Sequence, residues 1–504
     1  GTGKTFTLAT LFTRLVVERN LRIGQVLAVT FTDAATQELR KRIRARLALA
    51  AAQVKHCQEP DAAPEIALTR TILADHLARS GEAAAALEKR LRLAAEETDL
   101  AAVFTIHGFC ARVLSEYALD SGHRLDGPEL VTNLKPLHAE VAADLWRVLA
   151  QDADQVAVLT TLWKNHAQLA ADLPALLGEE PLFPQPLQTG PEEITLAQAQ
   201  QRLHDAGPPL QQAIASHGED FRQALLAAVE NKWLNGNSYK AGWIHELFEQ
   251  FRHWDGEGPL HEKAANLLPE TLLGRTSKAG AGKTPASPLQ APLAHWMQAR
   301  QSLDNVLRAQ SIHLLHSLRQ QARQRVQHLK SQRRLQTYDD LIEGVARALE
   351  GPRGDALVAQ LRQQYAIALV DEFQDTDPRQ WAIFRRVFGH SEHVQAAGKA
   401  PALFLIGDPK QAIYGFRGGD VHTYLQAKTQ ANVALMLDHN FRSRPCVLAA
   451  IDALYTQAGE RGFSQEGIRF ETVHAGRADA DADFTIDAVP APGLVLQRVE
   501  SDGD

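Results

Sequence analysis

The sequence predicts an α/β fold with a parallel sheet and a large, mostly helical insertion. Three short apolar runs, at 25–32, 365–370 and 402–406, show little polar alternation, and polar residues follow each of them at once. Such runs are typical of central parallel strands buried on both faces. Stretches rich in Ala, Leu, Arg and Glu separate the runs, as helices do in an α/β domain. Between 121 and 336, Pro- and Gly-containing loops interrupt helix-like segments and no strong strand occurs.

Composition excludes several classes of protein. The 504 residues are 45% hydrophobic and 22% charged, which is ordinary for a globular chain. Lys and Arg number 53 against 60 Asp and Glu, a net charge of −7, so any nucleic-acid contact must come from local patches. Cys57, Cys110 and Cys446 match no metal or redox spacing, which excludes a disulfide scaffold and fits a reducing cytoplasm. We expect neither a membrane span nor a signal peptide.

The first five residues, GTGKT, match the second half of a phosphate-binding loop, and an apolar helix pattern follows them. Glycines let backbone N–H groups approach phosphates, and the helix N-terminus adds positive potential. The lysine would reach the β- and γ-phosphate oxygens, and the threonine hydroxyl can bind Mg²⁺. A glycine-rich helix cap is the alternative. The predicted nucleotide-binding residues of this segment are Gly1, Thr2, Gly3, Lys4 and Thr5.

Two carboxylates, Asp371 and Glu372, follow the apolar run at 365–370 directly. This order places them at the carboxyl end of a strand, where functional groups of parallel sheets gather. Asp371 can hold Mg²⁺, usually through water, and Glu372 can polarise an attacking water. Alternatively, the two acids only end the strand and face solvent. Together with the phosphate-loop segment, they predict hydrolysis of a nucleoside triphosphate.

The acidic pair lies within LVDEFQDTD, and with that stretch the chain resembles superfamily 1 DNA helicases of the UvrD/Rep type. Within them it is most similar to the RecB-type subunits of helicase–nucleases. The forms AATQEL, IHGFC and GDPKQAIYGFRG favour the RecB type. The supporting stretches, in order, are GTGKT (1–5), AVTFTDAATQELRKRI (28–43), FTIHGFCARVL (104–114), TYDDLI (337–342), ALVDEFQDTDP (368–378), LFLIGDPKQAIYGFRGGD (403–420) and LDHNFRSRP (437–445).

The resemblance implies a RecA-like P-loop NTPase domain in two parts, at 1–120 and 337–430. A helical insertion domain would occupy 121–336, and a second RecA-like motor domain would begin at 431–504. Because the chain starts inside the phosphate loop, we expect it to be cut at both ends. The later helicase motifs and the nuclease domain of RecB-type proteins do not occur in it, so nuclease activity is not expected from these residues.

The resemblance also implies a nucleotide site that uses ATP and Mg²⁺. Thr5 and Asp371 would bind the metal, and Gln374 would link the nucleotide state to neighbouring motifs. Phe441 would stack near the adenine. Outside this family, an exposed loop amide at Gln411 and a salt-bridged arginine at position 442 would be the simpler interpretations. The implied catalytic residues are Lys4, Asp371, Glu372, Gln411 and Arg442, the last two acting on the γ-phosphate.

Single-stranded DNA would contact aromatic and polar residues, since base–aromatic stacking tolerates any sequence. A lone histidine is more often a core or capping residue than a ligand. The residues implied are Phe31, Thr32, His107, Tyr414, Phe416 and Arg417. Two basic stretches, at 40–46 and 319–334, could meet DNA phosphates, although such charge runs are usually solvated helix faces.

The function implied is an ATP-dependent 3′–5′ DNA helicase and translocase in double-strand-break repair and recombination. Its partners would be single-stranded DNA, duplex ends, and RecC-like and RecD-like subunits, with no membrane contact. A UvrD-like or AddA-type repair helicase is the alternative within the family. A non-catalytic DNA-binding scaffold would be expected to lack Lys4, Glu372, Gln411 or Arg442, and all four are present. A transporter- or clamp-type ATPase would need an LSGGQ-like signature, and none occurs.

We predict that these 504 residues alone hydrolyse ATP poorly, because half of the phosphate loop and the upstream adenine-recognising glutamine of the family are missing. Steady-state phosphate release with and without single-stranded DNA measures this directly. Vigorous DNA-stimulated turnover by the isolated chain would overturn the prediction.

Overall fold

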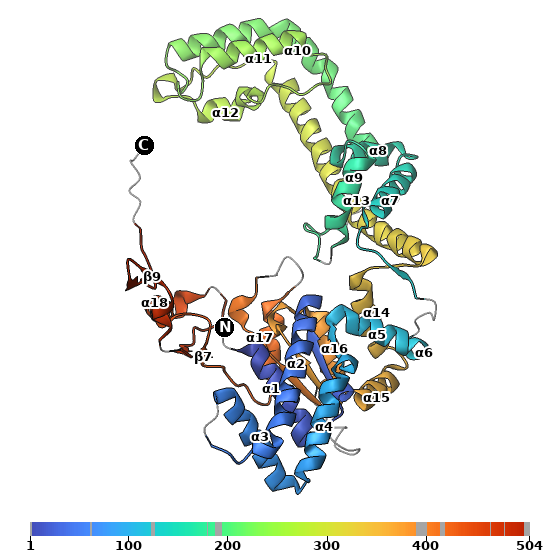
Figure 1. Cartoon of the computed structure of the whole chain (residues 1–504). Coiled ribbons are helices and arrows are strands. Elements are labelled where there is room, and N and C mark those ends of the chain that lie inside the picture. The colour runs from blue at the N-terminus through green and yellow to red at the C-terminus, as the bar shows by residue number, and fades with distance from the viewer. Residues whose placement is uncertain are drawn as a thin grey trace. The chain divides into compact units, whose positions relative to one another are not determined.

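The computed structural model describes residues 3–60, 63–121, 127–178, 180–186, 194–389, 401–413, 419–463, 465–477 and 479–497 (Figure 1). The chain divides into two compact units. One unit combines Gly1–Thr132 with Arg334–Asp504, and the other is Asn133–Arg333. The second unit is therefore inserted into the sequence of the first.

A four-stranded, fully parallel sheet forms the centre of the first unit. Its strand order is β2-β1-β5-β6, and three of these strands coincide with the apolar runs that the sequence predicts. The α/β fold class is thereby confirmed. The strand β2 was not predicted, because three residues are too few to show a pattern. The strands are β1 (Val26–Thr30), β2 (Val103–Thr105), β5 (Ile367–Val370) and β6 (Ala402–Leu405).

Helices cover both faces of this sheet (Figure 1). Alternate strand residues enter different cores: Leu27 and Val29 pack on one face, and Val26 and Ala28 pack on the other. This alternation follows from the two-residue repeat of a strand. The first face carries α5 (Ile106–Glu116), α14 (Tyr338–Glu350), α15 (Gly354–Gln364) and α16 (Pro378–Phe388). The second carries α1 (Lys4–Arg19), α2 (Asp33–Gln53), α3 (Pro64–Ser80) and α4 (Ala84–Glu96).

The rest of this unit consists of short elements. Within the described residues of this unit, three two-stranded pairs occur: β3 with β4 and β7 with β8 are parallel, and β9 with β10 is antiparallel. These elements are α6 (Ala118–Ser121), β3 (Glu129–Leu130), β4 (Leu335–Gln336), α17 (Val421–Gln430), β7 (His439–Asn440), α18 (Pro445–Ala458), β8 (His474–Ala475), β9 (Thr485–Ile486) and β10 (Val489–Pro490).

The inserted unit is helical in its described part, apart from one isolated bridge between Leu234 and Thr276. Two long helices, α10 and α13, pack against each other, and the aromatic side chains of α11 fill the core beside them. Its helices are α7 (Lys135–Leu149), α8 (Ala153–Leu162), α9 (His166–Leu177), α10 (Leu196–Glu230), α11 (Ala241–His253), α12 (Pro269–Gly274) and α13 (Gln290–Arg333). Among the described helices of the whole chain, none is long and apolar enough to cross a membrane.

Truncation of Leu27 tests the central position of β1. Its side chain is 0% exposed, so Leu27→Ala should lower the free energy of unfolding by about 2–5 kcal/mol. Urea unfolding followed by circular dichroism measures the change. The matched control is Leu100→Ala, whose side chain is 74% exposed and whose effect should stay within about 0.5 kcal/mol. Equal effects of the two substitutions would contradict the assignment.

Candidate functional site

A glycine in the left-handed backbone conformation caps the N-terminus of α1. Gly3 has φ +79, a conformation that side-chain-bearing residues rarely adopt, and it directly precedes Lys4, the first residue of the helix. The carbonyl of Gly3 accepts from the Thr7 N–H at 2.9 Å. The buried residues of α1 fix the helix against the sheet. The other two predicted loop residues, Gly1 and Thr2, lie outside the described residues.

A tight turn follows β5 at the carboxyl edge of the sheet. The Asp371 N–H donates to the Val29 carbonyl at 2.9 Å, and the Phe373 N–H donates to the Ile406 carbonyl at 2.9 Å. Between these two bonds, Glu372 has φ 49, the left-handed region, which costs a non-glycine residue about 1–2 kcal/mol. Neighbouring strands on both sides therefore impose a strained backbone at one predicted catalytic position, as is frequent at functional sites.

Lys4 forms an ion pair with Glu372, so the N-terminus of α1 meets the end of β5 directly. The Lys4 ammonium also lies 3.5 Å from the Gln411 side-chain oxygen, and the Gln411 amide donates to Asp408 at 3.0 Å. Gln374, which is 2% exposed, donates to Glu372 at 3.0 Å and accepts from the Asp408 N–H at 3.0 Å. These contacts join α1, the loop after β5 and the loop after β6 in one polar cluster.

Gly407 and Asp408 belong to this cluster, although sequence reasoning did not single them out. A Cβ atom on Gly407 would lie 2.8 Å from the Gln374 side-chain oxygen and 3.1 Å from the Tyr424 ring. Any side chain there would displace Gln374 from its bond with the Asp408 backbone. The motif GDPKQ contains both residues. Gly407 acts by leaving room for Gln374, whereas Asp408 binds Gln374 through its backbone N–H and Gln411 through its carboxylate.

Burial raises the pKa of Asp371, and the negative charge of Glu372 raises it further. Burial likewise raises the pKa of Asp375, again with a contribution from Glu372. A nearby cation stabilises the ionised form of such a buried carboxylate. Mg²⁺ prefers one or two carboxylates together with water and phosphate oxygens. Asp371 therefore has the chemistry of a Mg²⁺ ligand, and its sharing of the ion with the Thr5 hydroxyl stays a prediction. Among the described residues, no group of three or more His, Cys, Asp or Glu could hold a metal by itself.

The predicted DNA-contact residues have different environments. Thr32 caps α2, because its hydroxyl accepts from the Ala35 N–H at 3.1 Å. Phe31, beside it, is partly buried. His107 lies in the first turn of α5, and its ring meets the Tyr338 ring edge-on at 5.0 Å between centroids. The remaining three predicted residues, Tyr414, Phe416 and Arg417, lie outside the described part of the chain.

Phe441 and Arg442 make local contacts in the part of the chain that the structure describes. The Phe441 ring stacks on His439 at 6.4 Å and is 59% exposed. The backbone N–H of Arg442 donates to the Asn440 side chain at 2.8 Å. No described contact links either side chain to Lys4, so their action on a bound nucleotide stays a prediction.

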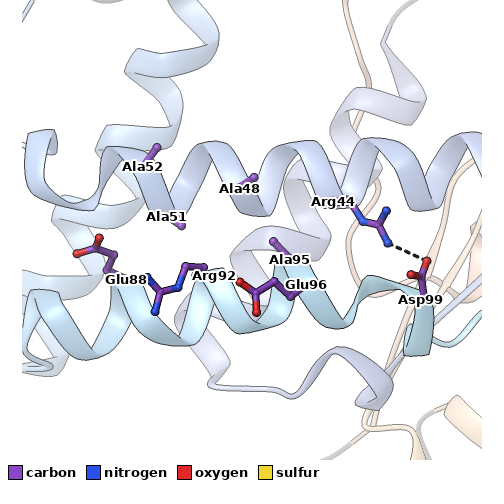
Figure 2. Close-up of a pocket in the computed structure, with 9 residues that line it drawn as sticks. All are labelled: Arg44, Ala48, Ala51, Ala52, Glu88, Arg92, Ala95, Glu96 and Asp99. Carbon is purple, nitrogen blue, oxygen red and sulfur yellow. Dashed lines mark hydrogen bonds and ion pairs between the residues drawn. The ribbon is translucent and has the colours of Figure 1, made fainter.

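Several arginines of both basic stretches have structural partners, which favours the alternative to DNA binding. In α13, Arg325 pairs with Asp144 at 2.6 Å, and Arg333 pairs with Glu140 at 2.6 Å. In α2, the contacts are Arg40 with the Val103 carbonyl, Arg42 with Glu38, Arg44 with Asp99, and Arg46 with Glu65. Figure 2 shows Arg44 and Asp99 at one end of a hollow between α2 and α4, whose floor is formed by alanines. That hollow shares no residue with the Lys4 cluster.

Comparison with known proteins decides the family. The model of the UvrD/REP helicase N-terminal domain matches residues 1–432. The chain belongs to the UvrD/REP helicase family. The matched range contains the whole Lys4 cluster and every strand of the four-stranded sheet.

Individual relatives within this helicase family are RecB subunits. The chain is 31% identical over 526 residues to the RecBCD enzyme subunit RecB of Escherichia coli, with 100% of this chain and 41% of the relative aligned. Identity to the RecB subunit of Haemophilus influenzae is 28% over 536 residues, covering 100% and 43% of the two chains. The RecB subunit of Mycobacterium tuberculosis is 29% identical over 459 residues, covering 91% and 29%. The chain thus spans well under half the length of these curated relatives.

The raised pKa of Asp371 predicts a pH-dependent stability. An acid whose pKa is higher in the folded state than in the unfolded state resists ionisation in the fold. The folded state therefore loses stability as the pH rises from 3.8, the ordinary pKa of the carboxyl group, through the higher pKa of the folded state. Asp371→Asn should therefore raise the urea midpoint at pH 7, and the gain should vanish at pH values below that window. Asp75→Asn, at a side chain 63% exposed, should show no such pH-dependent gain. A pH-independent effect at Asp371 would refute the argument.

Proposed function

We propose that this helicase-family chain hydrolyses ATP with Mg²⁺ and uses the energy to move 3′–5′ along single-stranded DNA as the motor part of a RecB-type subunit. The observation that carries the proposal is the cluster of Lys4, Glu372, Gln374 and Gln411 at the carboxyl edge of the sheet. One cation from the N-terminus of α1, and one carboxylate and two amides from the loops after β5 and β6, meet there. Phosphoryl transfer needs little more from a protein than such positioned charge.

The Lys4–Glu372 ion pair indicates how the site would respond to ATP. The γ-phosphate carries more negative charge than the carboxylate, and with the N-terminus of α1 it would draw the Lys4 ammonium away from Glu372. The released carboxylate could then accept a proton from the attacking water. Mg²⁺, held by Thr5 and Asp371, would neutralise charge on the β- and γ-phosphate oxygens.

Gln374 would transmit a movement of Glu372 from the phosphate site to the loop after β6. Its amide donates to Glu372 and accepts from the Asp408 N–H, and Asp408 in turn accepts from Gln411. A shift of Glu372 would therefore alter the loop after β6. That loop leads to the predicted DNA-contact residues Tyr414, Phe416 and Arg417, which connects the nucleotide state to the grip on DNA. Phe31, Thr32 and His107 would complete the DNA contacts.

The domains would divide the work as in other members of the family. Residues 1–120 and 337–430 would form the first motor domain, 121–336 the insertion domain, and 431–504 the start of the second motor domain. From that second domain, Arg442 would act on the γ-phosphate and Phe441 would stack near the adenine when the motor closes.

The relatives named as RecBCD subunits support a place in double-strand-break repair with RecC-like and RecD-like partners. A cytoplasmic location would follow from that role, and a sequence with three cysteines at no metal or redox spacing fits it. A UvrD-like or AddA-type repair helicase is the second candidate. Retention of every charged and amide group in the cluster disfavours a non-catalytic scaffold.

ATP hydrolysis by the full-length protein, with and without single-stranded DNA, tests the proposal. Lys4→Gln should abolish DNA-stimulated turnover, because it removes the positive charge that binds phosphate. Glu372→Gln should lower kcat about 10²–10⁴-fold while ATP binding persists, because only proton transfer is lost. Unwinding of duplexes with a single 3′ or 5′ tail measures the direction of movement.

Glu18→Gln is the matched control, since Glu18 lies on the same helix as Lys4 and its ion pair in the described chain is with Arg14, one turn away. Its turnover should equal that of the unmodified protein. DNA binding without any ATP hydrolysis in the complete protein would favour the scaffold. Preference for a 5′ tail would refute the proposed direction.

A further inference from the structure

One aromatic ring spans the two loops whose side chains meet Lys4. Tyr424 lies on α17, which packs against both the turn after β5 and the short turn that ends at Gln411. The centroid of the Tyr424 ring lies 6.2 Å from that of Phe373, with 43° between the ring planes. The same ring would lie 3.1 Å from a Cβ atom placed on Gly407. The ring is therefore packed against one residue of each loop.

A single hydrogen bond from Gln374 joins the same two loops. Its side-chain oxygen accepts from the Asp408 N–H at 3.0 Å, and the residue is 2% exposed. Asp408 directly follows Gly407, and a glycine leaves the backbone more conformational freedom than any other residue. Packing from a neighbouring element must therefore fix the backbone at this point. The Tyr424 ring supplies that packing.

The helix that carries the ring is anchored at its N-terminus. The Asp420 carboxylate caps α17, since it accepts from the His422 N–H at 3.0 Å and from the Thr423 N–H at 3.2 Å. The Asp420 N–H in turn donates to the Thr376 carbonyl at 3.3 Å. Thr376 follows the turn after β5 and is 1% exposed. The cap thus ties α17 to the loop that holds Gln374, so the ring is mounted on an anchored helix.

We propose that Tyr424 is a positioning residue for ATP hydrolysis: its ring holds the loop after β6 where the Asp408 N–H meets Gln374. The inference rests on the proposed ATP-driven motor and adds to it a residue outside the motifs that indicate the family. Gln374 also donates to Glu372. A loop that drifts away from Gln374 would therefore leave the amide, and with it the Glu372 carboxylate, less well placed. A misplacement of about 1 Å can cost about 10²-fold in rate.

The Tyr424 phenol stays neutral beside this acidic loop. Burial raises the pKa of Tyr424, and the negative charge of Asp408 raises it further. An uncharged ring can pack against the loop without repelling the carboxylates around it. The contacts with Phe373 and Gly407 are made by the ring. Phenylalanine should therefore serve equally well at this position.

Steady-state ATP hydrolysis by the full-length protein, with saturating oligo(dT), tests the inference. Tyr424→Ala should lower kcat about 10- to 100-fold, because the loop after β6 loses its support. The KM for ATP should change little, because Lys4 and the N-terminus of α1 are untouched. Tyr424→Phe should keep normal turnover. Gln426→Ala, at an exposed position of the same helix, is the matched control and should hydrolyse ATP like the unmodified protein.

A double-mutant cycle distinguishes positioning of Gln374 from a general loss of structure. If the ring acts through Gln374, Tyr424→Ala should add little to the loss of kcat in Gln374→Ala, because both changes remove the same bond. Losses that multiply would show that the ring acts elsewhere and would overturn the inference. Should Tyr424→Ala lower the urea midpoint, Tyr424→Leu keeps apolar volume without the flat ring, and its loss of kcat should depend on Gln374 in the same way.

The remaining outcomes separate this inference from the proposed function. Normal kcat in both Tyr424→Ala and Tyr424→Leu would overturn the inference and leave the motor intact. An equal loss in Tyr424→Phe would overturn it as well, because the hydroxyl rather than the ring would then be required. Absence of ATP hydrolysis by the unmodified full-length protein would instead overturn the proposed function, and this inference with it.

Discussion

Burial of the sheet on both faces is the constraint on which the rest of the structure depends. Every residue of β1 and of β5 is buried, so no polar group can be carried within these strands without a large desolvation cost. Polar side chains are confined to the edge where the parallel strands end. Because the strands run in one direction, their carboxyl ends coincide, and residues from distant parts of the sequence meet there.

The same constraint explains the strain at Glu372. Backbone bonds from β5 to its two neighbours continue past the end of the strand, through Asp371 on one side and Phe373 on the other. The residue between them must turn sharply, and its left-handed conformation accompanies the ion pair with Lys4. Rigid strands thus hold one member of the pair, while the packed helix α1 holds the other.

Most of the charged residues of the cluster can be predicted from local sequence, because a carboxylate pair directly after an apolar run has few other places to lie. Gly407 could not be singled out in this way, since its role is to leave room for Gln374, a residue of another loop. The arginines of α13 show what a charge run alone leaves open. A run of positive charge resembles a DNA-binding surface until its partners, Asp144 and Glu140, are seen on a different helix.

The sequence by itself determined the fold class, the order of the central strands along the chain, and the residue types available for phosphate and metal binding. Strand periodicity and motif spacing are local properties, so they can be identified in a single amino-acid sequence. Only the tertiary structure decided which side chains touch: the Lys4–Glu372 pair, the bridge made by Gln374, and the exposed Tyr338 ring on His107. The first and last of these contacts join residues hundreds of positions apart, and Gln374 joins two loops 34 positions apart. All three depend on how the chain packs around the sheet, which no local pattern encodes.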